Sequence, residues 1–134
     1  MLAVMPKDGV PKPTDGELAI LRVLWDKGPS TVREVYEVVA TGRSLAYTTT
    51  LKLLQIMTDK GLTVREVRGQ QHLYRTAHRE EDTQRRLVGD LLERAFAGSM
   101  SKLVMQALAS KKTSPEELRV IRRLLATAKE RQHD

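Results

Sequence analysis

The stretch AYTTTLKLLQIMTDKG, residues 46–61, decides the fold of this chain. Its apolar side chains recur every three or four residues, which is the spacing that places them on one face of a helix. This stripe consists of Leu53, Leu54 and Met57, with Thr50 one turn earlier. Gly61 then provides the residue at which such a helix ends. The stretch therefore predicts a helix over residues 46–60.

The opposite face of this predicted helix is polar and carries small side chains near its N-terminal end. Such side chains can read DNA, because hydroxyls pair with several bases, lysine donates to guanine and an aliphatic group contacts the methyl of thymine. The candidates for base contact are Thr48, Thr49, Leu51 and Lys52. A helix surface that is rich in threonine without any binding role is the alternative interpretation.

Two further helices are predicted before this stretch, each from a local start signal. Thr14 and Glu17 have the spacing of a capping box, in which each side chain hydrogen-bonds the backbone of the other residue. Gly28 is expected to end the helix that they open. Thr31 and Glu34 repeat the capping-box spacing and predict a second, shorter helix.

After this stretch, the spacing of apolar residues changes from the helical period to the two-residue alternation of a strand. Residues 62–68 alternate and are rich in β-branched side chains, residues 69–71 are typical of a turn, and residues 72–76 predict a returning strand. Three helices and a hairpin in this order are typical of a winged helix-turn-helix. In that fold the third helix enters the major groove of DNA, and the hairpin lies along phosphates or a minor groove.

From residue 79 onward the pattern is helical and predicts no strand. One helix extends to about Gly98, a shorter one surrounds residues 103–108, and Ser114-Pro115-Glu116-Glu117 is a strong start signal for a third. Short helices with several apolar faces bury little by themselves, so we expect a dimer interface here rather than an intrachain core. The candidates for dimerisation are Leu87, Leu91, Phe96, Val104, Leu108, Leu118, Ile121 and Leu125.

These patterns predict a mainly α fold with a small β-hairpin wing. Residues 1–13 are expected to be a flexible N-terminal tail, residues 14–78 a winged helix-turn-helix DNA-binding domain, and residues 79–134 a helical dimerisation domain. The length of 134 residues suits one small domain with such an extension.

The charge distribution indicates a polyanionic partner. The chain carries a formal net charge of +6, of which residues 43–75 contribute +4 with only two acids, Asp59 and Glu66. A basic block with few acids is the electrostatic footprint of a nucleic-acid-binding surface. We therefore expect double-stranded DNA as a partner, bound with an affinity that falls as salt rises.

Composition argues against several other classes of protein. There is no cysteine, which excludes thiol catalysis and cysteine-ligated metals. The apolar runs are far shorter than the roughly 20 residues that span a bilayer, and Lys7-Asp8-Gly9 interrupts any signal-peptide pattern. No catalytic constellation is evident, and His72 and His78 lack a third ligand. We expect a cytoplasmic protein that is not an enzyme, has no membrane association and uses no metal or cofactor.

Several segments resemble the penicillinase and methicillin-resistance (BlaI/MecI-type) repressor family. The resemblance covers residues 14–131, and the run from Ala46 to Gly61 is its most diagnostic part. The matching segments are Leu24-Trp25, Thr31-Val32-Arg33-Glu34-Val35, Ala46-Tyr47-Thr48-Thr49, Leu54, Lys60-Gly61-Leu62, the hairpin from Gly69 to Tyr74, Phe96-Ala97-Gly98-Ser99 and Ser114-Pro115-Glu116-Glu117-Leu118.

The resemblance implies a homodimeric bacterial repressor that binds a dyad-symmetric operator, often one that controls antibiotic-resistance or stress genes. It also places the base contacts on the four candidates named above. The expected contacts to the DNA backbone are Thr31, Arg33, Tyr47, Arg68 and Gln70.

This chain departs from the family pattern at four positions, which are Thr50, Lys52, Ile56 and Gln70. The departures preserve the fold but change the operator sequence that is expected. Gln70 stands where relatives often have a wing arginine, and Arg68 is the candidate to replace that arginine.

The resemblance further implies a regulatory protease or sensor protein as a partner. Relatives in resistance systems are cut in the dimerisation region, often at an Asn-Phe bond, where this chain has Gln106-Ala107. Copper-responsive relatives use a cysteine-rich motif, so the absence of cysteine excludes that route of induction.

A protein–protein adaptor with the same fold is the rival hypothesis. In an adaptor without sequence-specific DNA binding, the exposed face of residues 46–60 would be rich in apolar or acidic side chains. Thr48, Lys52 and Gln55 on that face favour DNA instead.

Overall fold

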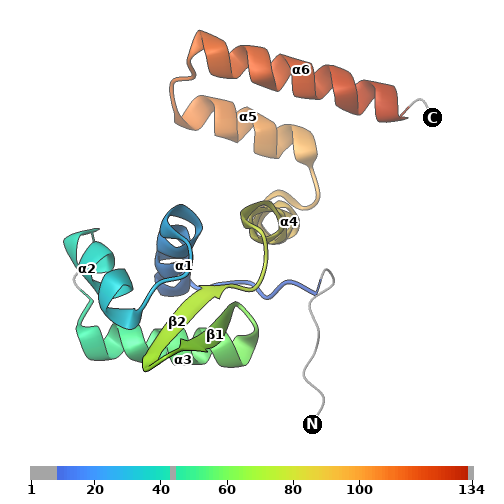
Figure 1. Cartoon of the computed structure of the whole chain (residues 1–134). Coiled ribbons are helices and arrows are strands. Elements are labelled where there is room, and N and C mark those ends of the chain that lie inside the picture. Colours follow the sequence, from blue (N-terminus) through green and yellow to red (C-terminus); the bar gives the residue numbers. More distant parts are fainter. Residues whose placement is uncertain (1–8, 43–44, 133–134) are drawn as a thin grey trace. The chain divides into compact units, whose positions relative to one another are not determined.

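Residues 9–42 and 45–132 are described by a computed structural model of the chain, and they form six helices and two strands (Figure 1). In chain order these elements are α1 (Asp15–Lys27), α2 (Val32–Gly42), α3 (Tyr47–Lys60), β1 (Thr63–Arg68), β2 (Gln71–Thr76), α4 (Glu80–Phe96), α5 (Met100–Ser110) and α6 (Pro115–Gln132). The prediction of a mainly helical fold with a small hairpin is confirmed. Residues 1–8 of the predicted tail and Arg43 of the basic block lie outside the described residues.

The chain divides into two compact units, residues 1–90 and 91–134, and the division falls inside α4. Helices α1, α2 and α3 and the β1–β2 hairpin belong to the first unit. Helices α5 and α6 belong to the second unit.

The first two helices begin at the predicted capping boxes. The Thr14 hydroxyl accepts a hydrogen bond from the backbone N–H of Glu17 at 3.3 Å, and the Glu17 carboxylate accepts from the backbone N–H of Thr14 at 2.9 Å. Thr31 and Glu34 make the same reciprocal pair at 3.2 and 2.9 Å. These local bonds satisfy backbone donors that a helix start otherwise leaves without partners, which is why the spacing is a reliable signal.

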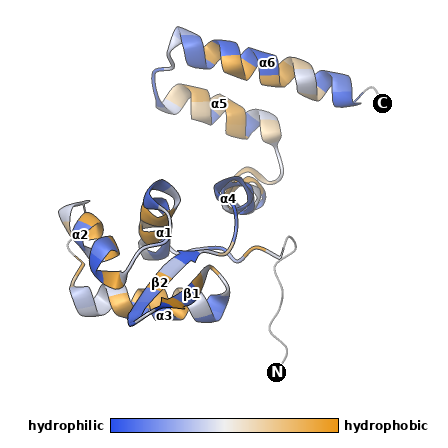
Figure 2. Cartoon of the chain, viewed as in Figure 1, coloured by the Kyte–Doolittle hydropathy of each residue, from blue (hydrophilic) through white to orange (hydrophobic). Residues whose placement is uncertain are grey.

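The core of the first unit lies between α1, α2, α3 and the hairpin. Thr50, Leu54 and Met57 of the predicted stripe are fully buried, and Leu53 is half-buried, so α3 turns this stripe into the core. Figure 2 shows hydrophobic and hydrophilic residues alternating around these three helices. The buried apolar side chains of the core cluster are Ile20, Leu21, Val23, Leu24, Val35, Val39, Leu54, Met57, Leu62 and Tyr74.

The hairpin is antiparallel and is joined to the segment between α1 and α2. Thr63 pairs with Thr76 at the base of the hairpin, and Arg68 pairs with Gln71 at its tip. Tyr74 and Ser30 exchange backbone hydrogen bonds of 2.9 and 2.8 Å, and the Tyr74 side chain is buried in the core cluster. The middle of β2 thereby anchors the hairpin to the segment between α1 and α2, and the tip of the hairpin is exposed.

Residues 9–13, the described part of the predicted flexible tail, pack against the first unit. Val10 and Pro13 are buried, and the Lys12 ammonium forms an ion pair with the Asp90 carboxylate in α4. The segment is held in place because burial of the apolar Val10 and Pro13 side chains away from water is favourable.

The second unit has no buried residue in α5 or α6. Its helix starts follow the sequence, because the Ser99 hydroxyl accepts from the Lys102 N–H at 3.3 Å and the Ser114 hydroxyl accepts from the Glu117 N–H at 3.1 Å. Large apolar side chains nevertheless remain exposed in this unit. They are Leu91, Met100, Met105, Leu108, Val120, Leu124 and Leu125.

Candidate nucleic-acid interface

The outward face of α3 carries most of the predicted base-reading residues. Thr48, Thr49 and Lys52 are exposed, whereas Leu51 is half-buried. The neighbouring Thr50 is fully buried, and its hydroxyl donates to the carbonyl of Ala46 at 3.1 Å. Burial of Thr50 fixes the rotation of α3, so the polar residues on either side of it face solvent.

The N-terminal end of α3 has no side-chain cap. Ala46 occupies the cap position and makes no side-chain hydrogen bond, and the first turn of α3 contains no acid. In contrast, α1, α2, α5 and α6 each begin with a threonine or serine hydroxyl that accepts a backbone N–H. Among the described residues, no side-chain cap and no acid compensates the dipole at the start of α3, which suits an approaching phosphate next to Thr48 and Thr49.

A cluster of one arginine and two tyrosines joins α2 to α3. The Arg33 guanidinium carbon lies 4.9 Å from the ring centroid of Tyr47 and 5.9 Å from that of Tyr36. The two rings contact edge to face, with centroids 5.5 Å apart and ring planes at 76°. Sequence analysis predicts Arg33 and Tyr47 as DNA contacts but assigns no binding role to Tyr36. The spacing of Arg33 and Tyr36 puts them on one face of α2. Their contact with Tyr47 cannot be predicted from the local sequence, because it depends on how α2 packs against α3.

The wing carries less free positive charge than its residue count predicts. Arg75 Nε lies 2.6 Å from the Glu66 carboxylate, and Arg68 lies 4.0 Å from the same carboxylate. Glu66 thus compensates Arg75 of β2 most strongly, and the less compensated cations of β1 are Arg65 and the highly exposed Arg68. Gln70, another predicted backbone contact, is exposed in the turn at the tip.

Thr31, the remaining predicted backbone contact, is half-buried, and its hydroxyl accepts from the Glu34 N–H in the capping box. The structure thus places the five predicted backbone contacts in two groups. Arg33 and Tyr47 contact each other at the start of α3, and Thr31 begins α2 close to Arg33 in sequence. Arg68 and Gln70 lie at the tip of the hairpin.

A part-buried ion pair connects the far end of α3 to the start of α1. Lys60 Nζ lies 2.7 Å from the carboxylate of Glu17, whose side chain is only 3% exposed. Burial alone would raise the pKa of Glu17, but hydrogen bonds from Lys60 and from the Thr14 backbone outweigh it and lower this pKa below its ordinary value of 4.5. Lys60, which belongs to the basic block, is therefore engaged in holding α3 in place.

The predicted dimerisation residues are spread over α4, α5 and α6. Leu87 is half-buried in the first unit, whereas the other seven belong to the second unit. Of these seven, Leu91, Leu108 and Leu125 are exposed. The half-buried ones are Phe96, Val104, Leu118 and Ile121.

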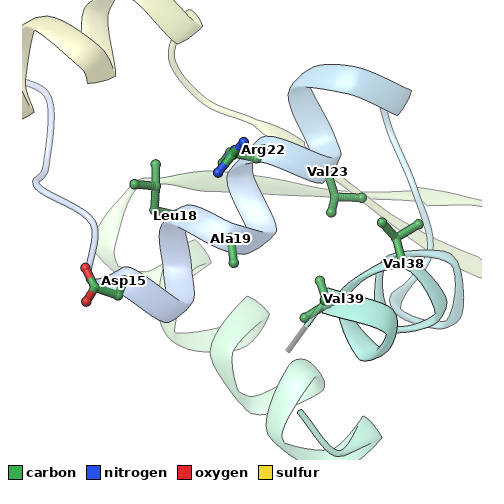
Figure 3. Close-up of a pocket in the computed structure, with 8 residues that line it drawn as sticks. Asp15, Leu18, Ala19, Arg22, Val23, Val38 and Val39 are labelled. Carbon is green, nitrogen blue, oxygen red and sulfur yellow. The ribbon is translucent and has the colours of Figure 1, made fainter. Parts of the chain in front are cut away.

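A hollow of about 560 Å³ lies between α1 and α2 (Figure 3). Its walls are mostly aliphatic, with Asp15 and Arg22 as the charged residues. Within residues 9–42 and 45–132, no three histidine or acidic side chains gather in a way that could hold a metal ion. Over the same ranges, no helix combines the length and the apolar character that crossing a membrane requires.

Comparison with known proteins identifies the family. Residues 13–127 match the family described as penicillinase repressor. The chain belongs to the penicillinase repressor family. Two similar relatives are the transcriptional regulator BlaI of Mycobacterium tuberculosis strains CDC 1551 / Oshkosh and ATCC 25618 / H37Rv. Each is 31% identical over 114 residues, which cover 84% of this chain and 81% of the relative.

A solved structure supports the fold of the first unit. The monomeric form of Bacillus licheniformis BlaI in complex with the blaP half-operator has a TM-score of 0.50 and 22% identity, and the match covers 55% of this chain and 89% of that one. This likeness confirms the winged-helix fold. Members of the penicillinase repressor family are transcriptional regulators rather than enzymes, in agreement with the class predicted from the sequence.

Proposed function

We propose that the chain is a homodimeric, sequence-specific transcriptional repressor that binds a dyad-symmetric operator through α3 and the wing at residues 62–76. The observation that carries this proposal is the outward face of α3. Its N-terminal end combines exposed Thr48, Thr49 and Lys52 with an uncapped helix start and the nearby cation of Arg33. This combination suits a DNA-binding surface, because phosphate contacts set the position of the helix and base contacts select the sequence.

In this proposal the two kinds of contact come from different residues. Thr48, Thr49 and Lys52 read bases in the major groove, and Leu51 contributes the part of its side chain that stays exposed. Arg33, Tyr47, Arg68 and Gln70, together with the start of α2 at Thr31, contact the DNA backbone. The phosphate contacts by arginine make the affinity depend on salt.

In this proposal the second unit forms the dimer interface. Exposed apolar side chains in a unit without buried residues favour burial against a second copy of the same surface. Residues 14–78 then form the DNA-binding domain and residues 79–134 the dimerisation domain. Two α3 helices related by a two-fold axis would occupy half-sites about one helical turn apart.

Membership of the family supports a proposal for the cellular setting. A repressor acts where the chromosome is, in the bacterial cytoplasm, and we infer that its operator controls antibiotic-resistance or stress genes. A regulatory protease or sensor protein would relieve repression. By the resemblance to the family, Gln106-Ala107 in α5 corresponds to the bond at which related repressors are cut.

Selection of duplexes from a random pool by the full-length protein, at two salt concentrations, tests the proposal. The expected result is an enriched palindrome, bound more weakly at the higher salt concentration. Salt-dependent retention without an enriched sequence would contradict sequence-specific reading. No retention at either salt concentration would contradict DNA binding and favour the protein–protein adaptor.

A further inference from the structure

Arg33 is held by aromatic faces rather than by an acid. Its guanidinium carbon is within about 6 Å of both tyrosine ring centroids, the range in which a cation is attracted to a ring face. Among the described residues, no carboxylate forms an ion pair with Arg33. The adjacent Glu34 carboxylate instead accepts the Thr31 N–H of the capping box at 2.9 Å. The charge of Arg33 is therefore positioned without being neutralised.

Stacking on a ring leaves the edge of a guanidinium available. The donors of arginine lie in the plane of the group, so a ring on its face does not compete with an anion at its edge. A flexible exposed arginine loses side-chain entropy when it binds a phosphate, whereas an arginine already held on two rings loses less.

The cluster lies next to the residues of α3 that are proposed to read DNA bases. Tyr47 is the first residue of α3, and Thr48 and Thr49 follow it immediately. Arg33 and Tyr36 come from the first turns of α2, so the cluster joins the two helices of the helix-turn-helix at this end of α3. A phosphate bound by Arg33 would thus lie close to the bases that the threonines read.

We propose that Tyr36 is a positioning residue for operator binding. It holds the Arg33 guanidinium against Tyr47 and sets this cation in place for a DNA phosphate before the duplex is bound. The inference rests on the proposed function and extends it, because Tyr36 acts only through Arg33 and contacts no DNA itself. Tyr36 is half-buried and is not part of the core cluster, so its ring serves the arginine more than the stability of the unit.

The test compares operator binding by the full-length protein carrying Tyr36→Leu, Tyr36→Phe, Arg33→Met or the double substitution Arg33→Met/Tyr36→Leu. Affinity is measured over a range of salt concentrations on the selected palindrome, and the melting temperature of each variant is recorded. Arg22→Met, which removes an exposed arginine from α1 outside the cluster, is the matched control.

Tyr36→Leu is expected to weaken operator binding about three- to tenfold. The double variant Arg33→Met/Tyr36→Leu should lose less affinity relative to Arg33→Met, because the arginine that Tyr36 holds is already absent. Arg33→Met should make the slope of log affinity against log salt shallower by about 0.9 per protomer, and Tyr36→Leu should shift it in the same direction. Tyr36→Phe keeps a ring face and should bind like the unmodified chain. Arg22→Met should leave both affinity and slope unchanged.

Equal losses from Tyr36→Leu with and without Arg33 would overturn the proposal, as would a lowered melting temperature with an unchanged salt slope. Failure of the proposed function gives a different result, because the unmodified chain would then select no palindrome. The unmodified chain could instead select a palindrome while Tyr36→Leu weakens binding equally with and without Arg33. In that case the repressor function stands and the positioning role of Tyr36 does not.

Discussion

The two units of this chain differ in how they use their apolar residues. In the first unit, α1, α2, α3 and the hairpin bury a contiguous cluster that includes Ile20, Leu54 and Met57 with no exposure at all. In the second unit, α5 and α6 have no fully buried residue, and Leu124 and Leu125 are 62% and 60% exposed. The first unit thus has an internal core, whereas in the second unit no residue of α5 or α6 is fully buried and several large apolar side chains are exposed.

In the proposed function, this difference separates the reading of DNA by the first unit from dimerisation by the second. A reading surface such as the polar face of α3 works only if its helix is held rigidly, and a complete internal core provides that rigidity. An assembly surface must stay open to a partner, so it retains apolar side chains that a self-sufficient domain would bury. The following predictions test this division, beginning with the largest expected effect.

Removing a core side chain from α3 should damage the first unit severely. Leu54→Ala deletes a fully buried side chain and is expected to lower the free energy of unfolding by roughly 2–5 kcal/mol. Leu124→Ala, at an exposed position of α6, should change it by less than about 0.5 kcal/mol under dilute conditions. Urea denaturation followed by circular dichroism measures both. Comparable losses in the two variants would contradict the difference between the units.

A charge in the apolar surface of α6 should abolish assembly without unfolding the first unit. Leu125→Asp is expected to convert the dimer to a monomer and to weaken operator binding at least about tenfold, because an unpaired charge does not pack in a dimer interface. Thr127→Asp, about 200° further around the same helix, is the matched control and should remain dimeric. Sedimentation equilibrium measures the oligomeric state. A dimeric Leu125→Asp variant would place the interface elsewhere.

The Glu17–Lys60 pair should make the first unit sensitive to acid. Because hydrogen bonds and the Lys60 charge lower the pKa of Glu17 in the folded chain, its contribution to stability is present above pH 4.5 and is lost as pH falls through the lowered pKa. Glu17→Gln is expected to cost about 1–2 kcal/mol at pH 7 and to cost less in acid. Urea denaturation at a series of pH values tests this. A cost that stays constant down to pH 3 would show that the ionised form is not the one that stabilises.

Removing one hydroxyl that contacts a base should have the smallest effect of these substitutions. Thr49→Ala is expected to weaken operator binding by about 1 kcal/mol and to relax the preference at one base position of each half-site. Repeating the duplex selection with the variant measures both quantities. Thr41→Ala, at an exposed threonine near the end of α2, is the control and should keep the original preference. Unchanged discrimination by Thr49→Ala would remove Thr49 from the residues that read bases.

Local signals explain why most elements could be predicted from the sequence. Thr14, Thr31 and Ser114 each bond a backbone N–H three residues away, so their patterns are complete within a few neighbouring letters. The hairpin is visible for the same reason, since its period and turn are local. Similarly, the stripe of α3 indicates which face of that helix is buried and which face remains for DNA.

The contacts that complete the candidate site are not local, and no short pattern encodes them. Glu17 and Lys60 are 43 residues apart, so their pairing depends on how α1 packs against α3. The contact of Tyr36 with Tyr47 likewise requires the packing of α2 against α3. Arg75 would count as a free cation from the sequence, yet the hairpin register brings it beside Glu66.

The most direct measurement is the mass of the full-length protein, free in solution and bound to its selected duplex, by sedimentation equilibrium. The expected result is a free species of twice the 15.1 kDa chain mass and two chains on each palindromic duplex. These values would mean that the second unit is completed by a second copy and that two α3 helices read one operator. A free species of 15.1 kDa at every concentration, with a single chain per palindrome, would contradict both conclusions.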